Sequence, residues 1–173
     1  AQAHIVLGSA TVPHADPQRH TLILVDTLLG GGMSSRLFQR VREELGLAYS
    51  VYTFQSFQRD VGVHGVYAGT APESADETLE AVRAELRRIA ADGITPEELA
   101  MGKRQLKGQL TLSMESVSSR VYRAAAVELF DEPWLPLDDL LAQVDAVTLD
   151  GARDVCTSFF QPDGQTVVHL GPA

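Results

Sequence analysis

Residues 29–52 decide how this chain folds. They read Leu29-Gly-Gly-Gly-Met-Ser-Ser-Arg-Leu-Phe-Gln-Arg-Val-Arg-Glu-Glu-Leu-Gly-Leu-Ala-Tyr-Ser-Val-Tyr52. Apolar residues recur at helical spacing from Leu37, which predicts a helix over 34–45 with one apolar stripe. Gly46 ends that helix, and the residues after it predict a strand over 48–56. The chain therefore turns a corner from helix to strand at this glycine.

Arginine and tyrosine side chains gather around the corner. An arginine offers a rigid fork of donors for carboxylate or carbonyl oxygens, and a tyrosine hydroxyl can donate to a developing oxyanion. The simpler interpretation pairs the arginines with neighbouring glutamates or with solvent on an exposed helix face, and spacing alone favours it. The residues concerned are Arg36, Arg40, Arg42, Glu43 and Glu44.

The rest of the chain carries further strand and helix patterns. Residues 4–12 predict a strand, and residues 18–29 predict a buried helix that Gly30-Gly31-Gly32 ends in left-handed geometry. Residues 48–56 and 61–70 predict a hairpin. Five helical patterns and a last strand follow, over 74–92, 95–114, 117–130, 137–145, 149–160 and 166–170.

This order of elements predicts an α+β fold, in which helices pack on a mostly antiparallel sheet of about four strands, within a single domain covering 1–173. Two helix starts carry capping signals. Ser74 with Glu77 makes one capping box, and Thr95 with Glu98 makes another, with proline at the first helical position.

Composition argues against several classes of function. The 173 residues are 45% hydrophobic, and 23 acidic against 14 basic residues give a net charge of -9. An acidic surface repels phosphate backbones, so nucleic-acid binding is not expected. The apolar run 21–29 contains Asp26 and is too short to span a bilayer. Cys156 is the one cysteine and is interpreted as a small buried hydrophobe. The start at Ala1, without an initiator methionine, predicts a segment cut from a longer protein.

The sequence shows no motif for a metal or a nucleophile. None of the five histidines has the spacing His-Glu-x-x-His or His-x-x-Glu-His. His4, His64 and His169 lie in predicted strands and could meet across the sheet, but scattered sheet histidines are more often surface or satisfied core groups. The triple glycine lacks the Gly-Lys-Ser/Thr of a phosphate loop. The chain is therefore expected to bind no metal or cofactor of its own.

Several ungapped segments resemble the C-terminal domain of the M16 zinc peptidases, the pitrilysin and mitochondrial-processing-peptidase type. The strongest are Gly-Gly-Gly-Met-Ser-Ser-Arg-Leu-Phe (30–38) and Arg-Glu-Glu-Leu-Gly-Leu-Ala-Tyr-Ser-Val-Tyr (42–52). The resemblance continues, in the order of the family, through 67–72, 95–98, 103–108, 115–120 and 167–171. It covers nearly the whole chain.

The resemblance implies one half of a two-part enzyme. Family members carry two similar α+β domains that close around an unfolded peptide. The first holds zinc, and the second lacks the metal and contributes an arginine and a tyrosine seven residues apart. Here those positions are Arg42 and Tyr49. By resemblance, Arg42 would bind the substrate beside the scissile bond and Tyr49 would stabilise the oxyanion, while zinc sits in the partner N-terminal domain.

The implied function is therefore that of the substrate-binding, zinc-less half of a metalloendopeptidase, inactive alone. Two alternatives stay open. One is a non-catalytic scaffold such as the core subunits of the respiratory bc1 complex, and the other is a peptide-binding module that adds a strand to a sheet edge.

The implied partners are a zinc-bearing N-terminal domain or subunit and an unfolded peptide substrate. The isolated domain would expose a cleft wall, through which a homodimer is possible. The compartment is left open between the bacterial cytoplasm and the periplasm.

Overall fold

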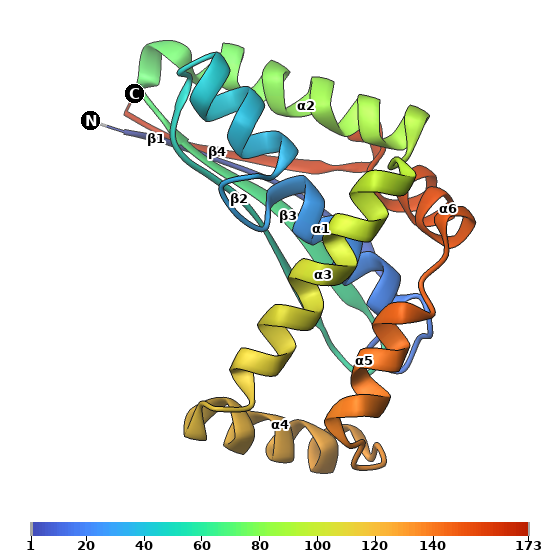
Figure 1. Cartoon of the computed structure of the whole chain (residues 1–173). Coiled ribbons are helices and arrows are strands. Elements are labelled where there is room, and N and C mark those ends of the chain that lie inside the picture. The colour runs from blue at the N-terminus through green and yellow to red at the C-terminus, as the bar shows by residue number, and fades with distance from the viewer. Residues whose placement is uncertain (1, 173) are drawn as a thin grey trace.

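Four antiparallel strands form one open sheet, which confirms the predicted fold class. The structure is a computed structural model and describes residues 2–172. The strands lie in the order β2-β3-β1-β4, and Figure 1 shows them with both ends of the chain at the same end of the sheet. Their bounds are β1 Ala3–Thr11, β2 Ala48–Phe57, β3 Gly62–Thr70 and β4 Thr166–Leu170.

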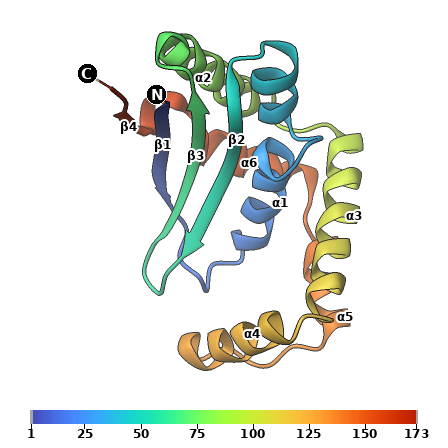
Figure 2. The ribbon, with the colours of Figure 1, turned by 90° about the vertical axis from the view of Figure 1, so that its left-hand side faces the viewer.

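Helices cover one face of this sheet and leave the other face bare over residues 2–172 (Figure 2). The α-helices are α1 Arg19–Gly30, α2 Ala75–Asp92, α3 Pro96–Ser113, α4 Val117–Phe130, α5 Leu137–Asp145 and α6 Leu149–Phe159. A π-helix, η1, spans Phe38–Glu44, and short 3-10 turns, η2 and η3, span Pro72–Ser74 and Pro162–Gly164. No helix in the described part of the chain is long and apolar enough to cross a membrane.

The core lies between the sheet and α1, α2 and α6. Alternate residues of β1 point into it, and α1 is buried along most of its length because it runs between the sheet and α3. Burying a leucine or isoleucine contributes about 1.5–3 kcal/mol. Large side chains that are fully buried include Ile5, Leu7, Leu22, Leu24, Leu29, Leu86, Ile89 and Phe160.

The histidines of the strands take separate places. His64 is fully buried, and its Nδ1 lies 2.9 Å from Oδ1 of Asp26, without the alignment of a hydrogen bond. The Nδ1 of His4 lies 2.8 Å from the hydroxyl of Tyr67. His169 is exposed on β4. The first two are therefore held by single polar neighbours within the fold.

Cys156 is fully buried in α6, as expected of a small hydrophobe. Burial raises the pKa of its thiol to about 11, so the thiolate is not populated at neutral pH.

The two predicted capping boxes have different outcomes. In the second, the Thr95 hydroxyl accepts from the backbone N–H of Glu98, and the Glu98 carboxylate accepts from the N–H of Thr95. The first prediction is wrong, because the 3-10 turn Pro72–Ser74 runs directly into α2 and the Ser74 side chain caps nothing. Its carbonyl instead accepts from the Thr78 hydroxyl at 2.7 Å.

The triple glycine does not take the predicted left-handed geometry. Gly31 has a φ of -83°, in the region open to every residue. The need for glycine at Gly30 is steric, because a Cβ there would lie 2.5 Å from the Thr53 side chain on β2. Gly30 therefore serves the close approach of α1 to the sheet.

Candidate functional site

The corner after α1 is built as a π-helix and not as the α-helix predicted over 34–45. Leu37 and Val41 are fully buried and anchor it, whereas Leu45 is 40% exposed. The wider i→i+5 turn of a π-helix moves the third apolar residue off the predicted stripe. Such segments frequently occur at functional sites. The hydrogen bond from the N–H of Leu47 to the carbonyl of Val41, at 2.9 Å, closes the corner.

Gly46 makes the change of direction possible. Its φ is +64°, in the left-handed region that favours glycine, and a Cβ there would meet no atom within 4 Å. The requirement for glycine is therefore one of backbone conformation alone. This position confirms the prediction that glycine ends the helix.

Arg42 presents its guanidinium at the surface of η1. The side chain is 45% exposed, and its Cζ lies 4.7 Å from the centroid of the Phe38 ring, so a cation–π contact holds it. Its nearest carboxylate, that of Glu43, approaches Nε only to 3.9 Å. The guanidinium therefore keeps most of its hydrogen-bonding capacity.

Tyr49 stands at the irregular start of β2. The pairing of β2 with β3 shifts register between Ala48 and Ser50, so Tyr49 falls outside the regular ladder. Its side chain is 63% exposed, and among residues 2–172 its hydroxyl has no hydrogen-bond partner. A bulge of this kind re-aims a side chain at the rim of a sheet. Arg42 and Tyr49 therefore both present free donors on either side of Gly46.

The other polar groups of the corner are engaged within the fold. Arg36 donates twice to the Glu98 carboxylate, at 2.8 and 2.7 Å, and once to the Gly93 carbonyl at 3.0 Å. Arg40 pairs with Glu44 at 2.6 Å. The predicted pairing with Glu43 or Glu44 is therefore found for Arg40, and for Arg42 only as a long contact. Arg36 instead ties the corner to the start of α3.

Tyr52, the second tyrosine of the stretch, belongs to the bare face of the sheet. Its ring stacks on Tyr67 with centroids 4.9 Å apart. Neither this stacking nor the Phe38 ring beneath Arg42 can be predicted from the sequence, because the first depends on strand register and the second on helix type.

Side chains of residues 2–172 do not fit a zinc site. In the part of the chain that the structure describes, no three His, Cys, Asp or Glu side chains gather as metal ligands. The buried pair of His64 and Asp26 offers two groups, which also engage Thr53 and the Phe160 ring. No step of chemistry is therefore assigned to a metal held by this chain.

The chain is thus an α+β domain whose sheet has one bare face over residues 2–172, with two free donors at a helix–strand corner. Residues 1–106 match the family model described as the Peptidase M16 inactive domain. The chain belongs to this family, as the sequence resemblance predicted.

Its relatives extend the match along the chain. It is 41% identical to an uncharacterized zinc protease of Streptomyces coelicolor, over 89% of this chain and 34% of that protein. It is 38% identical to an uncharacterized zinc protease of Bacillus subtilis, over 94% of this chain and 40% of that protein. The chain therefore spans between a third and two fifths of these relatives.

The solved structures agree. A peptidase M16 inactive domain from Pseudomonas fluorescens superposes with a TM-score of 0.88 at 26% identity, over 99% of this chain and 41% of that one. The family and the fold follow from these matches.

Proposed function

We propose that residues 1–173 form the zinc-less C-terminal domain of a longer or two-subunit metalloendopeptidase, and that they bind substrate for a zinc-bearing N-terminal domain. The observation that carries this is the contrast at the corner. Arg36 and Arg40 are paired with carboxylates, whereas Arg42 and Tyr49 are exposed and keep free donors. The relatives named zinc proteases are more than twice as long as the segment that matches this chain. Their remaining length is enough for a metal-bearing half.

The roles of the two side chains follow from their chemistry. A guanidinium donates through a planar fork, so Arg42 would hold a carbonyl or carboxylate of an extended peptide beside the scissile bond. A phenol donates a single directed hydrogen bond, so Tyr49 would stabilise the oxyanion that develops on that bond. Such a donor contributes only when the other half presents the reacting carbonyl, so the chain alone would not hydrolyse peptides.

The experiment that tests the two-half arrangement is reconstitution. Residues 1–173 and the zinc-bearing half are produced separately, and cleavage of an unstructured peptide is followed for each half, for the mixture and for the mixture with a zinc chelator. We expect cleavage only in the unchelated mixture. A zinc half that cleaves equally well alone would contradict the proposal, and a full-length protein that cleaves no peptide would favour the scaffold role.

A further inference from the structure

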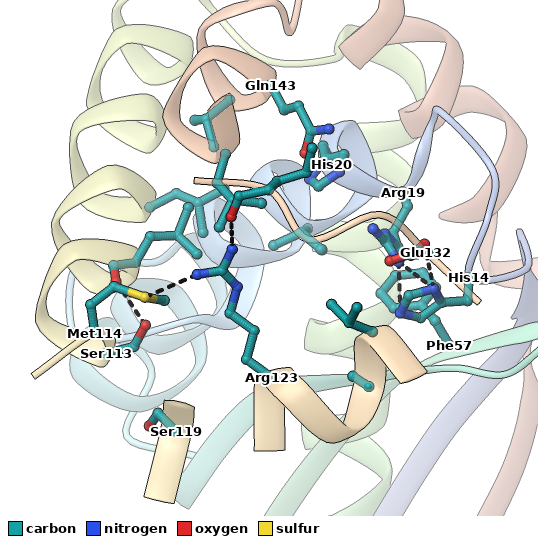
Figure 3. A pocket seen from close by; sticks show the side chains of 18 of the residues that line it. His14, Arg19, His20, Phe57, Ser113, Met114, Ser119, Arg123, Glu132 and Gln143 are labelled. Atoms are coloured by element: carbon teal, nitrogen blue, oxygen red, sulfur yellow. Dashed lines mark hydrogen bonds and ion pairs between the residues drawn. The ribbon is translucent and has the colours of Figure 1, made fainter. Parts of the chain in front are cut away.

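A cavity lies between α1, α3, α4 and α5 (Figure 3). It has a volume of about 390 Å³, within the range of small-molecule sites. Aliphatic and aromatic side chains form much of its walls, and polar groups lie at several places around it (Figure 3). The wall residues include Ile23, Phe57, Leu106, Leu110, Val127 and Leu140.

The cavity exists because α4 packs only lightly on the rest of the fold. α4 contains no buried residue. Its C-terminal end is held by the stacking of His14 on Phe130, with ring centroids 3.6 Å apart, and by a hydrogen bond from Arg59 to the Leu129 carbonyl at 2.8 Å. The helix therefore forms an outer wall that stands off the core without filling the space beneath it.

Arg123 reaches from α4 into this space (Figure 3). Its guanidinium lies 4.2 Å from the centroid of the Trp134 ring and donates to the Leu135 carbonyl and, at 3.2 Å, to the Met114 sulfur. Within residues 2–172 no carboxylate pairs with it. A half-buried cation beside apolar walls is stabilised when an anion joins it.

The other charges at the cavity cancel. Glu132 lies 3.4 Å from Arg19 and 2.9 Å from His14. Burial and the nearby Arg19 together hold the pKa of His14 below its usual range, so this imidazole is neutral at pH 7. Glu132 and Arg19 then form a neutral pair, and Arg123 remains the uncompensated charge of the cavity. A positive cavity is unusual in a chain whose net charge is -9.

We propose that the cavity binds a free medium-chain carboxylate, with the alkyl chain on the apolar walls and the carboxylate on Arg123. A guanidinium and a carboxylate form short charge-assisted hydrogen bonds. Burial of the alkyl chain against the apolar walls adds the hydrophobic contribution to the affinity. The site is separate from the corner. Phe57, in the cavity wall, is the last residue of β2, and Tyr49 lies near the start of the same strand. The separation of eight residues between them spans roughly 26 Å.

Binding is measured by isothermal titration calorimetry of the full-length protein with octanoate and decanoate, below their micelle concentrations. We expect one site, with affinity rising about fourfold per added methylene because each buried methylene contributes a nearly constant increment. Octanol, which has the same chain without the charge, should bind roughly tenfold more weakly or worse.

Three variants locate the site. Arg123→Met keeps an unbranched apolar stem and should abolish the preference for octanoate over octanol. Leu110→Trp fills the cavity and should abolish binding of both. Arg120→Met, an exposed arginine on the same helix, is the matched control and should bind as the wild type does.

Three outcomes would overturn the assignment. They are an absence of saturable binding, an octanoate affinity equal in wild type and Arg123→Met, and displacement of octanoate by short peptides with a free apolar C-terminus that bind more tightly. The last result would assign the cavity to peptide carboxylates instead. Because the readout is binding and not cleavage, its failure is independent of the role proposed for the corner.

Discussion

Arg42 and Tyr49 make fewer contacts within the fold than the neighbouring arginines and tyrosine do. Arg36 ties the corner to Glu98, and Tyr52 stacks on the bare face of the sheet. Arg42 rests on an aromatic ring, and Tyr49 leaves the regular ladder. At the residue scale, the contacts of each side chain thus distinguish the arginines and tyrosines that hold the fold together from those that keep free donors. The sequence alone does not show these contacts.

The pair of Arg36 and Glu98 makes stability depend on pH. Burial opposes ionisation of Glu98, but hydrogen bonds from Arg36 and from the Thr95 N–H outweigh it and lower the pKa below 4.5. A carboxyl whose pKa is depressed by folding stabilises the fold above its unfolded pKa, and this contribution is lost as pH falls through the folded value.

Urea unfolding of wild type and Glu98→Gln checks this dependence. We expect the variant to be less stable by about 1–2 kcal/mol at pH 7, and the difference to shrink as pH falls through and below 4.5. Asp163→Asn, in the exposed turn before β4, is a control that should change little. A difference between wild type and Glu98→Gln that stays constant down to pH 3 would contradict the role given to the ion pair.

At the scale of elements, the sequence predicts most of what the structure shows. Strands, helix order and the Thr95 cap follow from period, β-branching and capping chemistry, which are local. The π form of η1, the register shift at Tyr49 and the packing role of Gly30 were missed, because each depends on contacts with a distant element. The two site positions, Arg42 and Tyr49, were predicted from the resemblance to the family. The spacing of the residues alone favoured arginines that pair with glutamates or with solvent.

The left-handed backbone of Gly46 predicts how substitutions at the corner change stability. A Gly46→Ala substitution should destabilise the fold by about 1 kcal/mol, because an L-residue resists a φ of +64° although nothing crowds the Cβ. Gly108→Ala, in exposed α3 where a Cβ also meets nothing, should instead stabilise by about 0.5–1 kcal/mol. Urea unfolding at pH 7 measures both.

The sign of the two changes is the test. Stabilisation by Gly46→Ala would mean that the corner does not need left-handed backbone. Peptide cleavage by the full-length Gly46→Ala protein should also fall, since this residue sets the direction between η1 and β2.

At the scale of the molecule, the bare face of the sheet is an apolar surface that the fold itself leaves uncovered. Its exposed side chains include Tyr52, Phe54, Val63, Val168 and Leu170. Exposed apolar faces of this kind mark interaction surfaces. We expect the isolated chain to self-associate through this face at high concentration.

Sedimentation velocity over a concentration series measures that association. Val168→Glu, on the bare face, should shift the chain to monomer because it sets two carboxylates against each other in a C2 pair. Val121→Glu, on the exposed side of α4, is the matched control and should leave the association unchanged. A wild-type chain that is monomeric at every concentration would count against the expectation.

The measurement that tests the central claim most directly is peptide cleavage by the full-length protein, for wild type, Arg42→Ala and Tyr49→Phe, with and without a zinc chelator. Arg40→Ala and Tyr52→Phe are matched controls, and thermal unfolding verifies that all five proteins are folded. If this chain is half of the active site, chelator-sensitive kcat/KM should fall by ~100-fold or more in Arg42→Ala and Tyr49→Phe, and change little in the controls. Cleavage that is indifferent to both substitutions would contradict the claim and leave the domain as a scaffold or peptide holder.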